Sequence, residues 1–298
     1  MKRFIRRLLV IACVCCFVAQ MGISCFAISK ADTITNKRET VFSEYDYIVS
    51  LRRLNEIERN AIDIPMEEKQ IIFSNAVENE LLSRKNLSDE ILSKKYLYTK
   101  EQIAILREYN GGRLEEHAEL AAITGTLTIS EPIVMTATSN KIKVKVYWDW
   151  DHVPLVCNKD VFAVTWSPTF GSQNGNMRFK SSESNHTVWY APGGPYESRT
   201  VSITQVEPNR AVKSEFYMEL DEITWAKSGT FNLCLEAATG SAPLTEIGFY
   251  FAYGHTVIGL TPTVSFPAGF GITFGWNTST ADTLSGYVNV ATHSWHTN

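Results

Sequence analysis

Two acidic residues and a histidine near the middle of the chain are the first side chains whose types and spacing could do chemistry. In "KIKVKVYWDWDHVP", residues 141–154, Asp149 and Asp151 stand two apart and His152 follows. Two carboxylates on one strand face can share a cation or act as acid and base, and an imidazole adds a third ligand. These three residues are therefore the candidate ligand or metal site.

A helix-loop type of calcium site does not fit this stretch. With Asp149 as its first position, Val153 occupies a place that needs an oxygen ligand and Pro154 replaces the glycine of the sharp turn. We therefore expect no cofactor, with calcium held together with a distant loop as the alternative. The simplest arrangement is a pair of solvated carboxylates, one of them paired with a lysine across the strand.

Enzyme motifs are missing from the sequence. It contains no serine elbow, no helical two-histidine zinc motif, no phosphate loop and no dinucleotide fingerprint. This favours a protein that is not an enzyme. An extracellular hydrolase centred on Asp149 and Asp151 remains an alternative.

The uncharged segment "TPTVSFPAGFGITFGWNTST", residues 261–280, alternates apolar residues with small or polar ones. Such alternation is typical of a membrane-spanning strand, and equally of a core strand in a glycine-rich soluble sheet. A membrane-active or pore-forming protein that uses this segment is thus the second functional alternative.

Several tyrosines are predicted to face solvent, where an aromatic side chain suits a binding surface. They are Tyr147, Tyr196, Tyr217 and Tyr250. They favour a partner that is a cell-surface component, either a protein or a polysaccharide.

The N-terminal residues and the charge balance indicate where the protein works. Four basic residues precede an apolar run at residues 8–18, and "CFA" follows at residues 25–27, which is typical of a secretory signal peptide over residues 1–27. Its removal leaves 24 basic and 32 acidic side chains, a net charge of −8. The balance argues against nucleic acid as a partner, and we expect a secreted protein acting outside the cell or at the cell envelope.

Two cysteines remain after residue 27, Cys157 and Cys234. Outside the cell they suggest one disulfide bridge, and two free thiols are the alternative.

The elements that must position these side chains divide into two regions. Residues 28–123 have a helical pattern, with one helix around residues 45–57 and another from about Pro65 that turns Ala76, Val77 and Leu81 towards the core. Thr99 and Gln102 predict a capping box at the start of a third helix. The segment at residues 87–112 is similar to helical stretches of secreted proteins from Gram-positive bacteria, which implies a location rather than an activity.

Residues 124–298 change to a period of two, and all seven tryptophans lie there. The alternation sends Trp148 and Trp150 to the core face with the aliphatic residues before them, and Tyr147 and Asp149 to solvent. Strands are predicted at residues 141–150, 161–166, 187–190, 200–206, 214–220, 230–236, 246–253, 261–276 with an interruption, and 286–292. The fold class is therefore α+β, a helical N-terminal region followed by an antiparallel β-sandwich that could be barrel-like. The favoured function is a secreted, non-catalytic binding or interaction protein.

Overall fold

The structure is a computed structural model. It describes residues 40–47, 49, 67–171, 175–191, 197–221, 224–256, 262, 264–267, 270–274 and 278–298. The predicted signal peptide and most of the first predicted helix lie outside these residues. The described elements belong to one compact unit, Arg38–Asn298.

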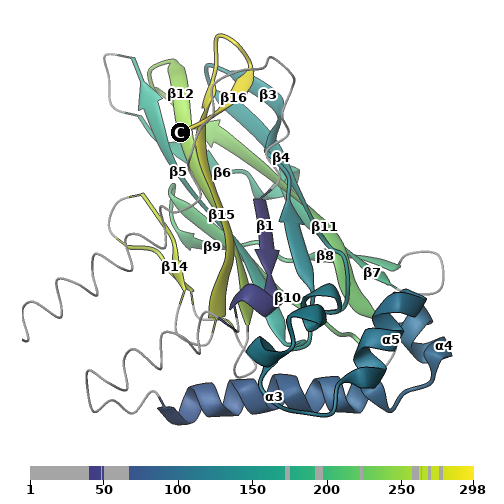
Figure 1. The fold of residues 1–298 in the computed structure, drawn as a ribbon. Helices are drawn as coiled ribbons and strands as arrows, with labels where there is room; N and C mark the ends of the chain where they lie inside the picture. The colour runs from purple at the N-terminus through teal and green to yellow at the C-terminus, as the bar shows by residue number, and fades with distance from the viewer. Residues whose placement is uncertain are drawn as a thin grey trace, which may run out of the picture. The chain divides into compact units, whose positions relative to one another are not determined.

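Antiparallel sheets make up most of the described chain (Figure 1). An eight-stranded sheet contains β1 (Thr40–Ser43), β2 (Thr126–Ile129), β3 (Ile133–Thr138), β4 (Lys141–Trp150), β6 (Met177–Phe179), β7 (Asn185–Ala191), β8 (Glu197–Val201) and β11 (Trp225–Ala237). A six-stranded sheet contains β5 (Lys159–Phe170), β9 (Thr204–Glu207), β10 (Ala211–Tyr217), β12 (Leu244–Thr256), β15 (Thr278–Asn289) and β16 (Ser294–Thr297). A third sheet pairs β13 (Val264–Ser265) with β14 (Thr273–Phe274).

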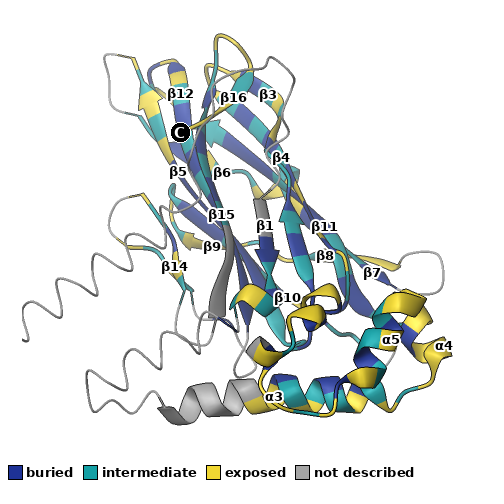
Figure 2. Ribbon diagram, viewed as in Figure 1, coloured by how far each residue is buried: buried dark blue, intermediate teal, exposed yellow. Residues whose placement is uncertain are grey.

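None of these sheets closes into a barrel among the described residues, so the barrel-like variant of the predicted fold finds no support there. The two large sheets turn apolar faces towards each other. The Trp148 ring of β4, for example, stacks on Phe216 of β10 at 5.0 Å and meets Tyr253 of β12 at 5.4 Å. Dark blue residues accordingly alternate along the strands in Figure 2.

Strand β4 has the bounds and the facing that its sequence predicts. Its residues alternate between buried and more exposed, with Trp148 and Trp150 at most 1% exposed. Burying one tryptophan removes about 150–250 Å² from water, which stabilises the fold by about 4–6 kcal/mol at about 25 cal/mol per Å². The two rings therefore anchor the β4 face.

Both tryptophans also donate a hydrogen bond in the core. Trp148 Nε1 donates to His186 Nε2 of β7 at 3.1 Å, and His186 Nδ1 lies 2.9 Å from Ser214 Oγ of the other sheet. Trp150 Nε1 donates to Tyr253 Oη, also of the other sheet, at 3.1 Å. The two large sheets are thus joined by polar links as well as by apolar contact.

Helices α3 (Glu67–Lys85), α4 (Asp89–Lys94) and α5 (Lys100–Glu108) lie between β1 and β2 in the chain. The predicted capping box is confirmed, because Thr99 and Gln102 exchange both bonds at the start of α5. In α3, Val77 and Leu81 are buried as predicted, whereas Ala76 is exposed. Short 3₁₀ turns follow at Leu114–Glu116 and Ala118–Ala122, and another lies at Ser181–Glu183.

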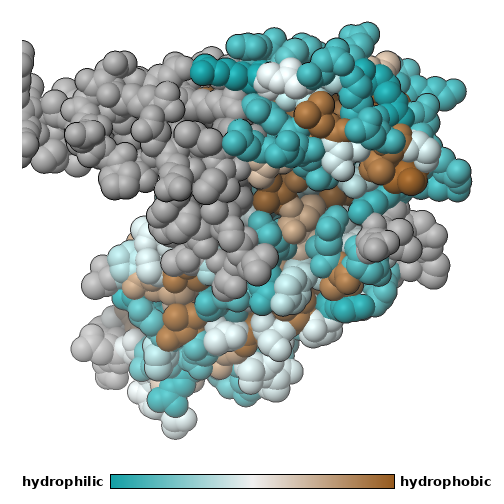
Figure 3. Space-filling model, turned by 90° about the horizontal axis from the view of Figure 1, so that it is seen from below, coloured by the Kyte–Doolittle hydropathy of each residue, from teal (hydrophilic) through white to brown (hydrophobic). Residues whose placement is uncertain are grey.

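The helices share one core with the sheets, and strand β1, which precedes the predicted boundary near residue 123, belongs to the eight-stranded sheet. Arg84 of α3 is 1% exposed and donates to Val153 O at 3.0 Å and to Pro154 O at 2.6 Å. Trp225 Nε1 of β11 donates to Lys95 O. Viewed from below, hydrophilic side chains predominate and hydrophobic ones form scattered spots (Figure 3).

Two sequence predictions are corrected. Residues 40–43, which lie in the region predicted to be helical, form a strand because they pair with β2 across more than 80 residues of chain. Residues 200–206 are not one strand, because β8 pairs with β7 in the eight-stranded sheet and β9 pairs with β10 in the six-stranded sheet. Long-range pairing decided both cases, and local patterns do not record it.

Candidate functional site

Asp149 lies on the outer face of the eight-stranded sheet, as its alternation predicts. Its carboxylate pairs with Lys227 Nζ of the neighbouring strand β11, at 3.1 Å from Oδ2. Lys227 sits where the register between β11 and β7 shifts, and its Nζ also donates to Trp150 O at 2.6 Å. The aspartate therefore has the lysine partner of the simplest predicted arrangement.

Asp151 and His152 have partners other than that of Asp149 and connect the end of β4 to the start of β2 and to α5. Asp151 Oδ1 accepts from Thr126 N at 2.6 Å and lies 3.0 Å from His152 Nδ1. Burial raises the pKa of Asp151, but hydrogen bonds from His152 and Thr126 outweigh it and hold the pKa below its usual value. His152 Nε2 lies 2.9 Å from Nε2 of Gln102, the capping residue of α5. Since an amide NH₂ can only donate, His152 Nε2 is the acceptor in this contact.

The three predicted residues therefore do not converge on one point. The described part of the chain holds no group of three or more His, Cys, Asp or Glu side chains placed to bind a metal ion. His152 links helix α5 to the end of β4, and the carboxylates of Asp149 and Asp151 are both exposed but have different partners.

The predicted disulfide bridge is absent, because Cys157 and Cys234 are both free thiols. The register explains why. Cys234 pairs with Lys143, seven positions before Trp150, whereas Cys157 follows the end of that strand. At about 3.3 Å per residue this separates Cys234 from the end of β4 by roughly 20 Å, far beyond the reach of a bridge.

The predicted surface tyrosines have different surroundings. Tyr147 and Tyr217 are exposed by 41% and 56%. Tyr250 is half-buried and meets Phe270 edge to face at 6.2 Å. Tyr196 lies outside the described residues. Tyr147 and Tyr217 are therefore the exposed residues among the three of these tyrosines that the structure describes.

Tyr147 and Asp149 both line an open groove of about 430 Å³ on the outer face of the eight-stranded sheet. The groove crosses β4, β11 and β7, and its lining is Tyr147, Trp148, Asp149, Trp189, Lys227, Ser228, Gly229 and Thr230. Trp189 of β7 is the aromatic residue that sequence reasoning missed. The alternation of β7 already sends it outward, but only the strand order brings it near Tyr147.

The register defines how the groove is built. Tyr147 is opposite Thr230, and Ser228 lies between Asp149 and Trp189 in the next row. Small side chains thus form the floor between two aromatic rings. From strand spacing and residue rise, the Cα atoms of Tyr147 and Trp189 are about 12 Å apart. Gly229 also lines the groove. Its position requires glycine, because a Cβ there would overlap with the Trp148 ring on the core side.

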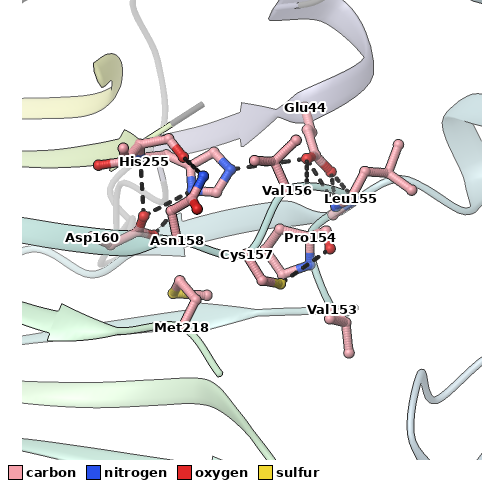
Figure 4. A network of polar contacts seen from close by, with 12 residues as sticks. Glu44, Val153, Pro154, Leu155, Val156, Cys157, Asn158, Asp160, Met218 and His255 are labelled. Carbon is pink, nitrogen blue, oxygen red and sulfur yellow. Dashed lines mark hydrogen bonds and ion pairs between the residues drawn. The ribbon is translucent and has the colours of Figure 1, made fainter. Parts of the chain in front are cut away.

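A second polar cluster lies buried where β1, the loop after β4 and the end of β12 meet (Figure 4). Glu44, Asp160 and His255 are each 0% exposed. His255 Nδ1 lies 3.0 Å from both Asp160 oxygens, and Glu44 Oε1 is 3.8 Å from His255 Nε2. Glu44 also accepts from Leu155 N at 2.8 Å and from Gly125 N at 3.2 Å. We call these three residues the buried triad.

The buried triad holds a charged imidazole. Burial lowers the pKa of His255, but the charge of Asp160, its hydrogen bond and the Glu44 carboxylate outweigh burial and raise the pKa to about 10. Asp160 further accepts from Tyr253 Oη at 2.7 Å and from Thr256 N at 3.1 Å. The triad thus ties three distant segments together by charge-assisted hydrogen bonds.

The buried triad is poorly placed for hydrolysis. All three side chains are inaccessible to solvent, and Cys157, the nearby thiol in Figure 4, donates to Pro154 O at 3.4 Å. Burial raises the pKa of the Cys157 thiol well above its usual value, which opposes thiolate formation. The buried triad therefore has a geometry suited to holding its three chain segments together.

The described part of segment 261–280 contains two short strands, β13 and β14, together with the beginning of β15. Ile272 is buried in a small cluster with Ala163 and Ala252 of the six-stranded sheet, whereas Phe270 is 43% exposed. Arg210 Nη2 donates to Phe266 O and Pro267 O. None of the described helices combines the length and apolar character that crossing a membrane requires.

Comparison with known proteins gives weak likenesses only. No family model and no curated protein sequence matches the chain. AvmM, which catalyses macrocyclization in alchivemycin A biosynthesis, is similar at 10% identity and a TM-score of 0.28, over 55% of this chain and 87% of that one. The collagen-binding subdomain ACE19 of the Enterococcus faecalis surface protein ACE is similar at 10% identity and a TM-score of 0.26, over 52% and 96%. A DUF4466 family protein from Parabacteroides merdae is similar at 10% identity and a TM-score of 0.26, over 56% and 44%.

Proposed function

We propose that this chain is a secreted, non-catalytic binding protein that acts at the cell surface or outside the cell. Its two large sheets form a β-sandwich, and the groove between Tyr147 and Trp189 binds a cell-surface component. The groove itself is the observation that carries the proposal, because it is open and places two aromatic side chains on one rigid face.

The surroundings of the groove support binding rather than catalysis. Asp149, the one predicted site residue in its lining, is paired with Lys227, and no second carboxylate is among the lining residues. General acid and base chemistry needs two groups within reach of one substrate bond. A rigid sheet face instead gives a preformed surface that loses little entropy on binding.

The test is retention of the purified full-length chain on intact Gram-positive cells and on their isolated walls. We expect retention by the wild-type chain and a loss of about tenfold in affinity for Tyr147→Ala, because aromatic anchors dominate binding energy. Tyr217→Ala is the matched control, since it removes an exposed tyrosine that is not among the groove-lining residues. Equal retention of both variants would refute the groove as the binding site.

Two further measurements separate the alternatives. Release of dye from liposomes that disappears in Phe270→Asp would favour the membrane-active protein. Hydrolysis of wall material that disappears in Asp149→Asn, with an unchanged melting curve, would favour the hydrolase. Retention without release or hydrolysis is the expected result.

A further inference from the structure

We infer that the ligand of the groove is an uncharged saccharide chain, recognised by the rings of Tyr147 and Trp189 and by the hydroxyl of Thr230. This inference rests on the proposed function and names the chemical class of its ligand.

The main chain under the groove cannot bind a peptide as an added strand. The groove crosses β4, β11 and β7, and β11 is paired on both sides, with β4 and with β7. Strand addition needs a free sheet edge with unpaired N–H and C=O groups. A ligand on this face must therefore be recognised by side chains alone.

The rings suit a ligand with flat apolar faces. Tyr147 is 41% exposed and Trp189 is partly exposed, and they stand on strands at either side of β11. A separation of about 12 Å between their Cα atoms lets an extended chain of rings contact both. Sugar rings combine apolar C–H faces with hydroxyl edges, and such faces pack on tyrosine and tryptophan.

Thr230 supplies the polar contact between the rings. It is 5% exposed and lines the groove, and its Oγ1 is buried without a hydrogen-bond partner among the described residues. A buried hydroxyl normally has a hydrogen-bond partner, and a buried hydroxyl without one lowers the stability of the fold. A ligand hydroxyl that both donates and accepts could fill this role from within the groove.

The charges of the groove lining cancel. Asp149 and Lys227 are its charged residues, and they pair with each other at 3.1 Å. An ionic ligand would have to compete with this pair, whereas a neutral ligand leaves it intact. Lys145 lies beside the lining, with its Nζ 5.7 Å from the Tyr147 ring centroid, so an anionic polysaccharide is a necessary comparison probe.

The experiment is native affinity electrophoresis of the full-length chain in gels that contain one polysaccharide each. The neutral probes are laminarin, hydroxyethyl cellulose, dextran, galactomannan and xyloglucan, and the anionic probe is polygalacturonate. We expect retardation by at least one neutral probe. Tyr147→Ala and Trp189→Ala should each raise its dissociation constant about tenfold, and Thr230→Val by about two- to tenfold.

Controls keep these outcomes distinct from misfolding. Thr230→Val keeps the shape of the side chain and removes the unpartnered hydroxyl, so its melting temperature should equal or exceed that of the wild type. Tyr217→Ala should stay within twofold of wild-type affinity.

Three results would overturn the inference. They are retardation by none of the five neutral probes, retardation by polygalacturonate alone, and neutral binding that Tyr147→Ala and Thr230→Val leave unchanged. If retention on cells still depends on Tyr147 while all neutral probes fail, the proposed binding function stands and only the ligand class is wrong. If both fail, the proposed function fails with it.

Discussion

Raising the pH from 6.5 to 8 should remove part of the stability that His255 contributes to this protein. In the unfolded chain this imidazole loses its proton near pH 6.5, whereas in the fold Asp160 and Glu44 hold its pKa at about 10. The folded state therefore binds more protons than the unfolded state between these values. The stabilisation is complete below pH 6.5 and is lost as the pH rises through 10.

The magnitude follows from the width of that window. Each pKa unit corresponds to about 1.4 kcal/mol, so the 1.5 pH units between 6.5 and 8 reduce the free energy of unfolding by about 2 kcal/mol. The group is fully buried, so solvent screening does not reduce this figure. Ordinary carboxyl, tyrosine and lysine side chains do not titrate in this interval, and comparison with a His255 variant separates this histidine from the other histidines and from the cysteines.

The assay is urea unfolding followed by tryptophan fluorescence at pH 6.5, 7, 7.5 and 8. Trp150 reports on the region because it donates to Tyr253, which donates to Asp160. The slope should vanish in His255→Gln, a variant that is also less stable at pH 6.5 because two buried carboxylates lose their cation. A wild-type stability that is flat or rises with pH would refute the reasoning, as would His255 ring signals in NMR spectra of the folded chain that titrate near pH 6.5.

The structure also predicts how three other perturbations change the free energy of unfolding. Burial lowers the pKa of His186 to about 3, so the free energy of unfolding should fall by about 2 kcal/mol as the pH drops from 6.5 to 5. In urea unfolding, His186→Asn should not show this dependence on pH. Gly229→Ala should lower the free energy of unfolding by about 1–3 kcal/mol, because the new Cβ overlaps with the Trp148 ring, and an unchanged midpoint would contradict this packing. Thr99→Ala should cost about 1 kcal/mol by removing the cap that pairs with Gln102, and full stability after this change would show that the cap contributes nothing.

The sequence by itself determined features that depend on neighbours a few residues away. The alternation of residues 141–150 fixed the strand, its bounds and the face of each side chain, because successive residues of a strand point to opposite sides. The capping box at Thr99 was equally readable, since both of its bonds close within three residues. Asp149 was found as a surface candidate for the same reason.

The tertiary structure decided which distant segments meet. Strand order placed Trp189 near Tyr147, and register kept Cys234 away from Cys157. The buried triad joins residues that are more than 200 positions apart, and no local pattern marks Glu44 as the partner of His255. Local periodicity fixes the direction of a side chain relative to its own strand, but pairing and packing choose its neighbours, so the groove and the buried triad exist only in the folded chain.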